Sequence, residues 1–290
     1  MNGILIVDKP TDWTSHDVVS KLRSALKIKR IGHGGTLDPM ATGVLPVFVG
    51  RATRAAEFCE NAEKEYIAGL RLGIVTDTQD ITGQTLSEGA RNVAAEELSA
   101  ALESFKGAQK QIPPMYSAIK RNGKKLYELA RRGIEVERPA RDVFISAIEM
   151  CGSSGNDYLL RVVCSKGTYI RTICHDIGAK LGTGAAMSSL RRTRAGAFKI
   201  EEARTLHDIL GSIARGDISK LLQPIDLLFS EHQETVLTEH DAEKVRNGAV
   251  FKANLGDNHY RFYGPSGEFL ALGEVVGGAG RAIKSFFDPR

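Results

Sequence analysis

A glycine-rich run that holds a single aspartate is the part of this chain best suited to chemistry. Four glycines, His33 and Asp38 fall within residues 30–46, where an apolar stretch begins at residue 44. Glycine permits backbone conformations and close approaches that a Cβ atom forbids, and the following Pro39 biases Asp38 away from helix. We therefore expect a rigid loop that holds one carboxylate, with a backbone able to lie against a ligand. The alternative is an ordinary turn in which Asp38 caps a backbone amide.

Three further motifs accompany this run. They lie at residues 3–10 with 14–17, at residues 64–66 with 72–73 and 76–80, and at residues 164–171. Together with GTLDPMATG at residues 35–43, they resemble, in the same order, the TruB family of tRNA pseudouridine synthases, in which the aspartate of G-x-L-D-P-x-A-T-G is catalytic. The resemblance covers about residues 1–230.

The resemblance implies three catalytic residues. Asp38 would be the essential carboxylate, ionised at neutral pH and able to act as a nucleophile. Whether it attacks the base or the sugar, or takes a proton from C2′, stays open. Arg171 would hold Asp38 through a bidentate contact, and Tyr169 would take or relay the C5 proton of the base. Since strand side chains alternate, we expect Tyr169 and Arg171 to share one face of a strand; a core tyrosine and a surface arginine are the alternatives.

Four more residues are expected at the substrate. Tyr66 would stack on a flipped uracil, and Leu190 would form an apolar wall of the uracil pocket. His33 would fill the gap left by the base or contact the RNA backbone, and Lys9 would brace the site without direct catalysis. A place in the core is the alternative for Tyr66, and a structural hydrogen bond is the alternative for His33.

Composition excludes several classes of protein. The 290 residues are 42% hydrophobic and 26% charged, as in ordinary globular proteins. No apolar run approaches the roughly 20 residues of a membrane helix, and residues 8–10 end the first apolar stretch too soon for a signal peptide. There is no dinucleotide or Walker motif, and the four cysteines and seven histidines lack metal-ligand spacing. We expect a cytoplasmic protein with no cofactor, no metal and no membrane contact.

Basic residues point toward nucleic acid. The net charge is +4, and clusters of this kind can neutralise phosphates. A solvated helix face is the alternative for any one cluster. The first cluster consists of Arg121, Lys124, Lys125, Arg131 and Arg132, and the second consists of Arg191, Arg192 and Arg194.

The patterning predicts an α+β fold, with a mostly antiparallel sheet flanked by helices, in a catalytic domain over residues 1–230. We expect strands near residues 3–7, 44–49, 66–72, 143–149 and 158–164, and helices near 15–26, 93–105, 126–132 and 172–181. Ser15 is expected to cap the first helix. Residues 231–290 predict a short helix and strands with glycine turns, and they resemble a small PUA-type RNA-binding domain.

We interpret the chain as a synthase that isomerises uridine 55 in the T loop of tRNA, as the resemblance implies. The reaction would use base flipping, glycosidic bond cleavage that depends on Asp38, and reattachment through C5. The expected partner is the T arm of tRNA, and the enzyme would be a monomer with no obligatory protein partner. Two alternatives stay open: a guide-RNA-dependent synthase subunit, and a tRNA-folding or RNA-binding protein in which catalysis is secondary.

Overall fold

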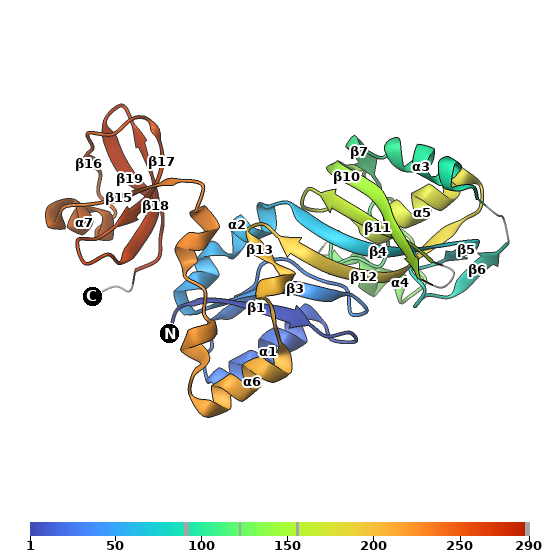
Figure 1. The fold of residues 1–290 in the computed structure, drawn as a ribbon, viewed down its shortest axis with the longest axis horizontal. Helices are drawn as coiled ribbons and strands as arrows, with labels where there is room; N and C mark the ends of the chain where they lie inside the picture. Colours follow the sequence, from blue (N-terminus) through green and yellow to red (C-terminus); the bar gives the residue numbers. More distant parts are fainter. Residues whose placement is uncertain (90–92, 122, 155–156, 288–290) are drawn as a thin grey trace. The chain divides into compact units, whose positions relative to one another are not determined.

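A computed structural model describes residues 1–89, 93–121, 123–154 and 157–287. The chain forms two compact units. Unit 1 consists of Met1–Pro39, Gly43–Glu60 and Gly196–Arg290, and unit 2 consists of Met40–Thr42 and Asn61–Ala195. Both units combine helices with mostly antiparallel strands (Figure 1), which confirms the α+β fold that the sequence predicts.

Unit 1 is built around two long apolar strands. β1 (Gly3–Lys9) pairs antiparallel with β3 (Thr42–Val49) along its whole length. β2 (Ile31–His33) pairs antiparallel with β3, and β14 (Arg204–Thr205) pairs parallel with β1. Nearly every residue of β1 and β3 is buried, which explains why both strands read as continuous apolar runs.

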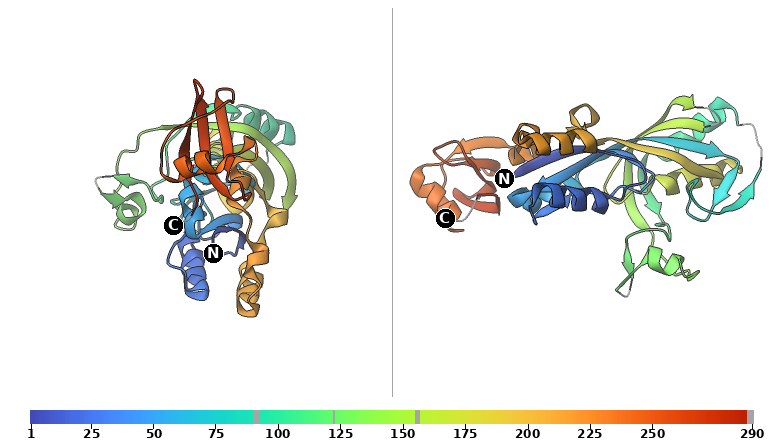
Figure 2. Two further views of the ribbon diagram at one scale, coloured as in Figure 1. Left: turned by 90° about the vertical axis from the view of Figure 1, so that its left-hand side faces the viewer. Right: turned by 90° about the horizontal axis from the view of Figure 1, so that it is seen from below.

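Helices α1 (Ser15–Leu26) and α6 (Leu206–Arg215) lie side by side in unit 1 (Figure 2, left-hand view). Helix α1 spans the predicted residues, but the prediction that Ser15 caps it is wrong. The cap is Thr14, whose hydroxyl accepts a hydrogen bond from the Asp17 amide while Asp17 accepts one from the Thr14 amide. This reciprocal arrangement satisfies two amides that the helix leaves unpaired.

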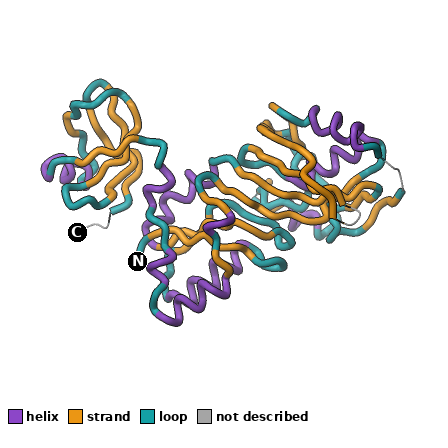
Figure 3. The backbone as a smooth tube through the Cα atoms, in the orientation of Figure 1, coloured by secondary structure: helices purple, strands orange, loops and turns teal. Residues whose placement is uncertain are grey.

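The last part of unit 1 is β-rich, as predicted, and has a hydrophobic core of its own. Five strands pair in the order β15-β17-β18-β19-β16, and helix α7 (Glu239–Arg246) packs beside them (Figures 1 and 3). The strands are β15 (Gln233–Val236), β16 (Phe251–Lys252), β17 (Asn258–Tyr263), β18 (Phe269–Val276) and β19 (Ala279–Ser285).

An aromatic cluster joins this β-rich part to the rest of unit 1. Phe229, at the end of the 3-10 helix η4 (Ile225–Phe229), has its ring centroid 5.0 Å from that of Phe58 in α2 (Ala56–Asn61). It also lies 6.0 Å from Phe269 and 5.7 Å from Phe286. Shorter elements complete the unit: η1 (Gly50–Ala55), β13 (Phe198–Lys199), η2 (Ile200–Glu202) and η3 (Ile218–Leu221).

Unit 2 contains antiparallel strands in the order β12-β4-β11-β10-β7. Helices α3 (Ala95–Glu103) and α5 (Ile170–Leu181) contact each other; α3 packs on β10, and α5 packs on β12 and β4 (Figure 1). The strands are β12 (Ala185–Ala195), β4 (Lys64–Leu72), β11 (Asp157–Cys164), β10 (Arg141–Ser154) and β7 (Gly107–Gln111).

Two small hairpins extend unit 2. One joins β5 (Ile74–Thr76) to β6 (Thr85–Glu88), and the other joins β8 (Lys120–Arg121) to β9 (Lys124–Lys125). Helix α4 (Leu126–Ala130) follows the second hairpin. In the right-hand view of Figure 2, the segment that carries α4 extends away from the sheet. No helix among the described residues is long and apolar enough to cross a membrane.

Candidate active site

The loop around Asp38 is held on both sides by buried side chains of unit 1. Before it, the Leu37 amide donates a hydrogen bond of 2.9 Å to the hydroxyl of buried Ser15 in α1. After it, the Pro39 carbonyl accepts one of 3.0 Å from Lys9 Nζ. Asp38 itself is half-buried. The flanking backbone is therefore fixed, while Asp38 keeps part of its surface exposed.

Lys9 braces this loop through backbone carbonyls. Its side chain is 0% exposed, and its ammonium also donates to the carbonyls of Pro10 at 2.9 Å and Trp13 at 2.5 Å. A buried ammonium needs such partners because desolvation without them is costly. Lys9 thus joins the backbone of residues 10 and 13 to that of residue 39.

The glycines of the loop serve packing as well as backbone geometry. A Cβ atom at Gly34 would lie 2.7 Å from Phe48 and 2.8 Å from the Cys59 sulfur, so protein atoms already fill that space. Gly43 adopts a φ of 102°, and its amide donates to Asp8 Oδ1 at 3.1 Å.

His33, the last residue of β2, pairs with Val47 in the ladder between β2 and β3.

Tyr169 and Arg171 lie at the start of a helix in unit 2, so the prediction that they share a strand face is wrong. Strand β11 ends at Cys164, Tyr169 is the N-cap of α5, and Arg171 is in its first turn. The two side chains nevertheless lie together: the Arg171 guanidinium carbon is 6.0 Å from the centroid of the Tyr169 ring. The turn at Ser165–Thr168, marked by the hydrogen bond from Thr168 Oγ1 to the Ser165 carbonyl, replaces the expected continuation of the strand.

Asp80 is a buried carboxylate beside Arg171 that the sequence prediction missed. Its Oδ2 is 3.7 Å from Arg171 Nη1, and each side chain is 6% exposed. Its Oδ1 accepts hydrogen bonds from the Thr78 hydroxyl at 2.9 Å and the Thr82 amide at 3.0 Å. Asp80 belongs to the motif at residues 76–80, and that motif was the available signal for a functional role.

A second hydrogen bond ties the same loop to α5. Thr172 Oγ1 donates to Gln79 Oε1 at 2.7 Å, and Gln79 has a positive φ of 66°, which is uncommon for a residue other than glycine. The Met187 amide of β12 donates to the Gln79 carbonyl at 3.0 Å. The loop is thus fixed to both the helix and the sheet around Arg171.

Tyr66 and Leu190 lie on neighbouring strands of unit 2. Tyr66 of β4 is opposite Arg192 of β12, and Leu190 is opposite Ala68. Because directly paired residues of an antiparallel ladder point to the same face and side chains alternate along a strand, Tyr66 and Leu190 share one face. Both are 8% exposed, and α5 packs on these two strands. Four of the predicted site residues therefore belong to unit 2, namely Tyr66, Tyr169, Arg171 and Leu190. The other three, His33, Lys9 and Asp38, belong to unit 1.

The second basic cluster does not form a single charged surface. Arg192 is 1% exposed and Arg191 and Arg194 are half-buried. Arg194 Nη2 forms an ion pair of 2.7 Å with Glu63, and Arg191 Nη1 donates to Thr42 Oγ1 at 3.2 Å. The clustering in sequence is misleading here because successive residues of β12 point to opposite faces of the sheet.

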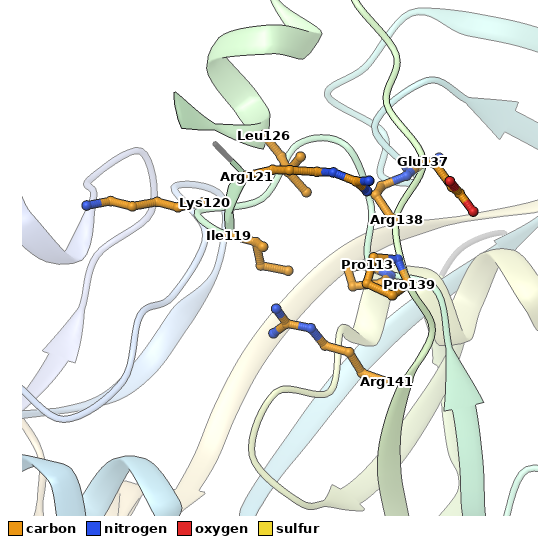
Figure 4. A pocket seen from close by; sticks show the side chains of 9 residues that line it. All are labelled: Pro113, Ile119, Lys120, Arg121, Leu126, Glu137, Arg138, Pro139 and Arg141. Carbon is orange, nitrogen blue, oxygen red and sulfur yellow. The ribbon is translucent and has the colours of Figure 1, made fainter. Parts of the chain in front are cut away.

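The first basic cluster is largely solvent-exposed, and one of its members, Arg121, lines a cavity of about 330 Å³ in unit 2. Arg121 and Arg141 direct their guanidinium groups into it (Figure 4). Arg138, whose Nη2 donates to Glu135 at 2.9 Å, also lines the cavity. The remaining lining residues are mostly apolar and comprise Pro113, Ile119, Lys120, Leu126, Glu137 and Pro139. The cavity thus combines apolar walls with cationic groups. Among the described residues, no cluster of His, Cys, Asp and Glu side chains could hold a metal ion.

Comparison with known proteins identifies the family. The profile of the TruB family pseudouridylate synthase N-terminal domain matches residues 23–170, and that of the tRNA pseudouridylate synthase B C-terminal domain matches residues 171–230. This chain belongs to the TruB family. The resemblance to the TruB family is thereby confirmed, and residues 23–230 are matched without a gap.

Relatives of high similarity carry one name. The chain is 44% identical over 282 residues to tRNA pseudouridine synthase B of Syntrophomonas wolfei, with 95% of this chain and 94% of the relative covered. It is 43% identical over 258 residues to the protein of that name from Bacillus velezensis, with 87% and 84% covered.

Solved structures extend the likeness to nearly the whole chain. A chain of a Cbf5-Nop10-Gar1 complex superposes with a TM-score of 0.76 at 29% identity, covering 98% of this chain and 85% of that chain. A chain of an H/ACA RNP bound to a substrate RNA containing 2′-deoxyuridine gives a TM-score of 0.75 at 28% identity, with 99% and 86% covered.

Proposed function

We propose that this TruB-family enzyme converts uridine 55 in the T loop of tRNA to pseudouridine. The observation that carries the proposal is the 41–45% identity, over most of the chain, to proteins named tRNA pseudouridine synthase B. The motif around Asp38 supports it in chemical terms, since it supplies one carboxylate on a braced loop.

The reaction is an isomerisation that needs no external reactant. The bond between N1 of uracil and C1′ breaks, the base rotates, and a bond from C5 to C1′ forms while C5 loses a proton and N1 gains one. Asp38 supplies the carboxylate, either as a nucleophile or as the base that removes a proton from C2′. Tyr169 takes or relays the C5 proton. The base stays in the site throughout, stacked on Tyr66 and walled by Leu190.

Arg171 supplies a positive charge that would keep the catalytic carboxylate ionised. Its guanidinium is nearly buried and is paired with Asp80, which fixes its direction. A guanidinium in such a place stabilises a neighbouring carboxylate in the ionised form. We propose that Arg171 does this for Asp38 when tRNA is bound.

RNA binding is assigned to surfaces apart from the reacting groups. The exposed arginines and lysines of the segment from residue 112 to 141 carry positive charge that suits phosphates. We propose that the β-rich module after residue 230 acts as the PUA-like RNA-binding domain, with residues 1–230 as the catalytic domain. The enzyme would act in the cytoplasm as a monomer on the T arm.

A guide-RNA-dependent activity is the second candidate, because chains of H/ACA assemblies share the fold. Identity to those chains is 28–29%, against 41–45% for the proteins named tRNA pseudouridine synthase B. This difference favours direct action on tRNA without a protein partner.

The deciding experiment incubates the pure protein with unmodified tRNA transcript in the presence of EDTA and maps pseudouridine by position. Modification at position 55 by the protein alone is the expected result. Modification only after a guide RNA or a partner protein is added would support the second candidate. Tight tRNA binding with no modification under any of these conditions would leave an RNA-binding protein as the better description.

A further inference from the structure

The side chain of Gln111 forms two hydrogen bonds with the backbone of Tyr169. Gln111 Nε2 donates to the Tyr169 carbonyl at 3.0 Å, and the Tyr169 amide donates to Gln111 Oε1 at 2.7 Å. Gln111 is 5% exposed. One buried amide therefore uses both its donor and its acceptor on a single residue, 58 positions away in the sequence.

Gln111 is well anchored for this task. It is the last residue of β7, and it pairs directly with Arg141 of β10. Buried Pro113 and Pro114 follow closely, and proline restricts the backbone. The amide is thus presented from a strand whose position the sheet fixes, rather than from a loose loop.

Tyr169 occupies a position where the backbone direction changes. It is the N-cap of α5, with φ of −96° and ψ of 109°, and its own side chain makes no capping hydrogen bond. Its carbonyl also accepts the helix hydrogen bond from the Ile173 amide at 3.1 Å. The bonds from Gln111 therefore set the orientation of the residue from which the phenol ring projects.

We propose that Gln111 is a positioning residue that holds Tyr169 in the orientation needed to exchange the C5 proton of uracil. This inference rests on the proposed function. Arg171, two residues further on, is held separately by Asp80. The effect of Gln111 therefore falls mainly on Tyr169, and it falls on the rate of reaction rather than on the affinity for tRNA.

The first test replaces Gln111 with methionine, which nearly keeps the volume and removes both hydrogen bonds. A misplacement of about 1 Å at a reacting group costs roughly 100-fold in rate, so the single-turnover rate at saturating enzyme should fall roughly 10- to 100-fold. The dissociation constant for tRNA should stay within about threefold, because phosphate contacts dominate affinity. Gln109→Met is the matched control: it is the same residue type on the same strand, and its side-chain amide donates to the carbonyls of Ser104 and Lys106 rather than to Tyr169.

The second test uses Gln111→Glu and pH. A protonated carboxyl donates and accepts like the amide, whereas a carboxylate faces the Tyr169 carbonyl with no proton to donate. Burial favours the neutral acid, while Arg141 on β10 and Arg171 in α5 favour the carboxylate. The rate of the variant relative to the wild type should therefore rise as the pH falls. A purely structural defect would not be restored in this way.

The third test combines variants. If Gln111 acts through the phenol, Gln111→Met should lower the rate of a Tyr169→Phe enzyme by less than about threefold, since interacting sites are not additive. Three results would each overturn the inference. They are a wild-type rate in folded Gln111→Met protein, a rate of Gln111→Glu relative to the wild type that does not change with pH, and fully additive effects of Gln111→Met and Tyr169→Phe on the rate. An inactive wild-type protein would instead count against the proposed function. If Gln111→Met does not fold, the pH dependence of the Gln111→Glu rate relative to the wild type tests the inference by itself.

Discussion

Arg171 and Asp80 form an ion pair in which both side chains are nearly inaccessible to water. The 3.7 Å separation between Nη1 and Oδ2 leaves Asp80 anchored mainly through its other oxygen, by Thr78 and Thr82. A buried pair of this kind orients its members more reliably than it stabilises the fold. Arg171 is thereby aimed by a residue outside the expected catalytic set.

Asp80→Asn should lower the single-turnover rate by roughly 100-fold while tRNA affinity changes less than about threefold. The substitution keeps the shape and an oxygen for Thr78 and Thr82, but it removes the charge that directs Arg171. Stability should fall as well, because removing one partner of a buried pair costs about 3–5 kcal/mol. Thermal unfolding measures the loss of stability, and rapid-quench measurement of pseudouridine formation gives the single-turnover rate, so the two effects can be separated. A folded variant with a wild-type rate would contradict the role given to Asp80.

Asp38→Asn should abolish turnover and leave tRNA binding within a few-fold of the wild type. The amide keeps the shape but is not an anionic nucleophile or base, and affinity comes mainly from phosphate contacts elsewhere. Filter binding and pseudouridine mapping on the same preparation check both halves. Measurable multiple turnover by a sequence-verified variant would remove Asp38 from the mechanism.

Arg121→Ala and Arg141→Ala should weaken tRNA binding several-fold without changing the saturated rate more than about threefold. Each variant should make the slope of log affinity against log salt less negative by about one unit. Lys110→Ala is the control, because Lys110 already forms an ion pair of 2.7 Å with Asp142. Equal effects of all three substitutions would show that position in the cavity does not matter.

Removing residues 231–290 should weaken tRNA binding more than it lowers the saturated single-turnover rate, since the candidate catalytic residues precede residue 195. The salt slope should change by only about one unit, because most basic side chains of this region are paired with carboxylates. The pairs include Arg246 with Glu268, Arg261 with Glu234, Arg281 with Glu274 and Lys284 with Glu57.

The truncation needs a control for exposed aromatic surface. Removing Phe269 and Phe286 uncovers Phe229, which is otherwise buried. A truncated protein that also carries Phe229→Ser tests whether any loss comes from aggregation. If the saturated rate collapses in a soluble, folded truncation, the β-rich module helps to assemble the active site and the division at residue 230 is misplaced.

Local patterns in the sequence predict most elements of this fold, and two cases show where such patterns fail. Helix α1 follows its apolar period over the predicted residues, but Thr14 rather than Ser15 caps it because Ser15 is drawn into a contact with Leu37. Strand β12 has no apolar alternation, since serine and arginine are mixed through it, and only its pairing with β4 reveals it.

A candidate site residue can be predicted from the sequence when it belongs to a motif. It cannot be predicted when only a tertiary contact brings it to the site. Asp38, Tyr66 and Arg171 are assigned by motifs. The N-cap position of Tyr169 depends on a turn after Cys164, and the contact from Gln111 spans 58 positions. A hydrogen bond between residues so far apart in the sequence leaves no local pattern of apolar and polar residues. Residues such as Gln111 can therefore be identified only in the folded structure.

Trp13 is the chain's single tryptophan, and its carbonyl shares the Lys9 ammonium with the carbonyl of Pro39. The backbone of Trp13 is thus tied through one shared cation to the loop that carries Asp38. We expect the tryptophan fluorescence of the unlabelled protein to respond when that loop moves, with no competing indole signal. Emission recorded while tRNA is mixed with the enzyme would time the arrival of substrate at the carboxylate, independently of the appearance of product.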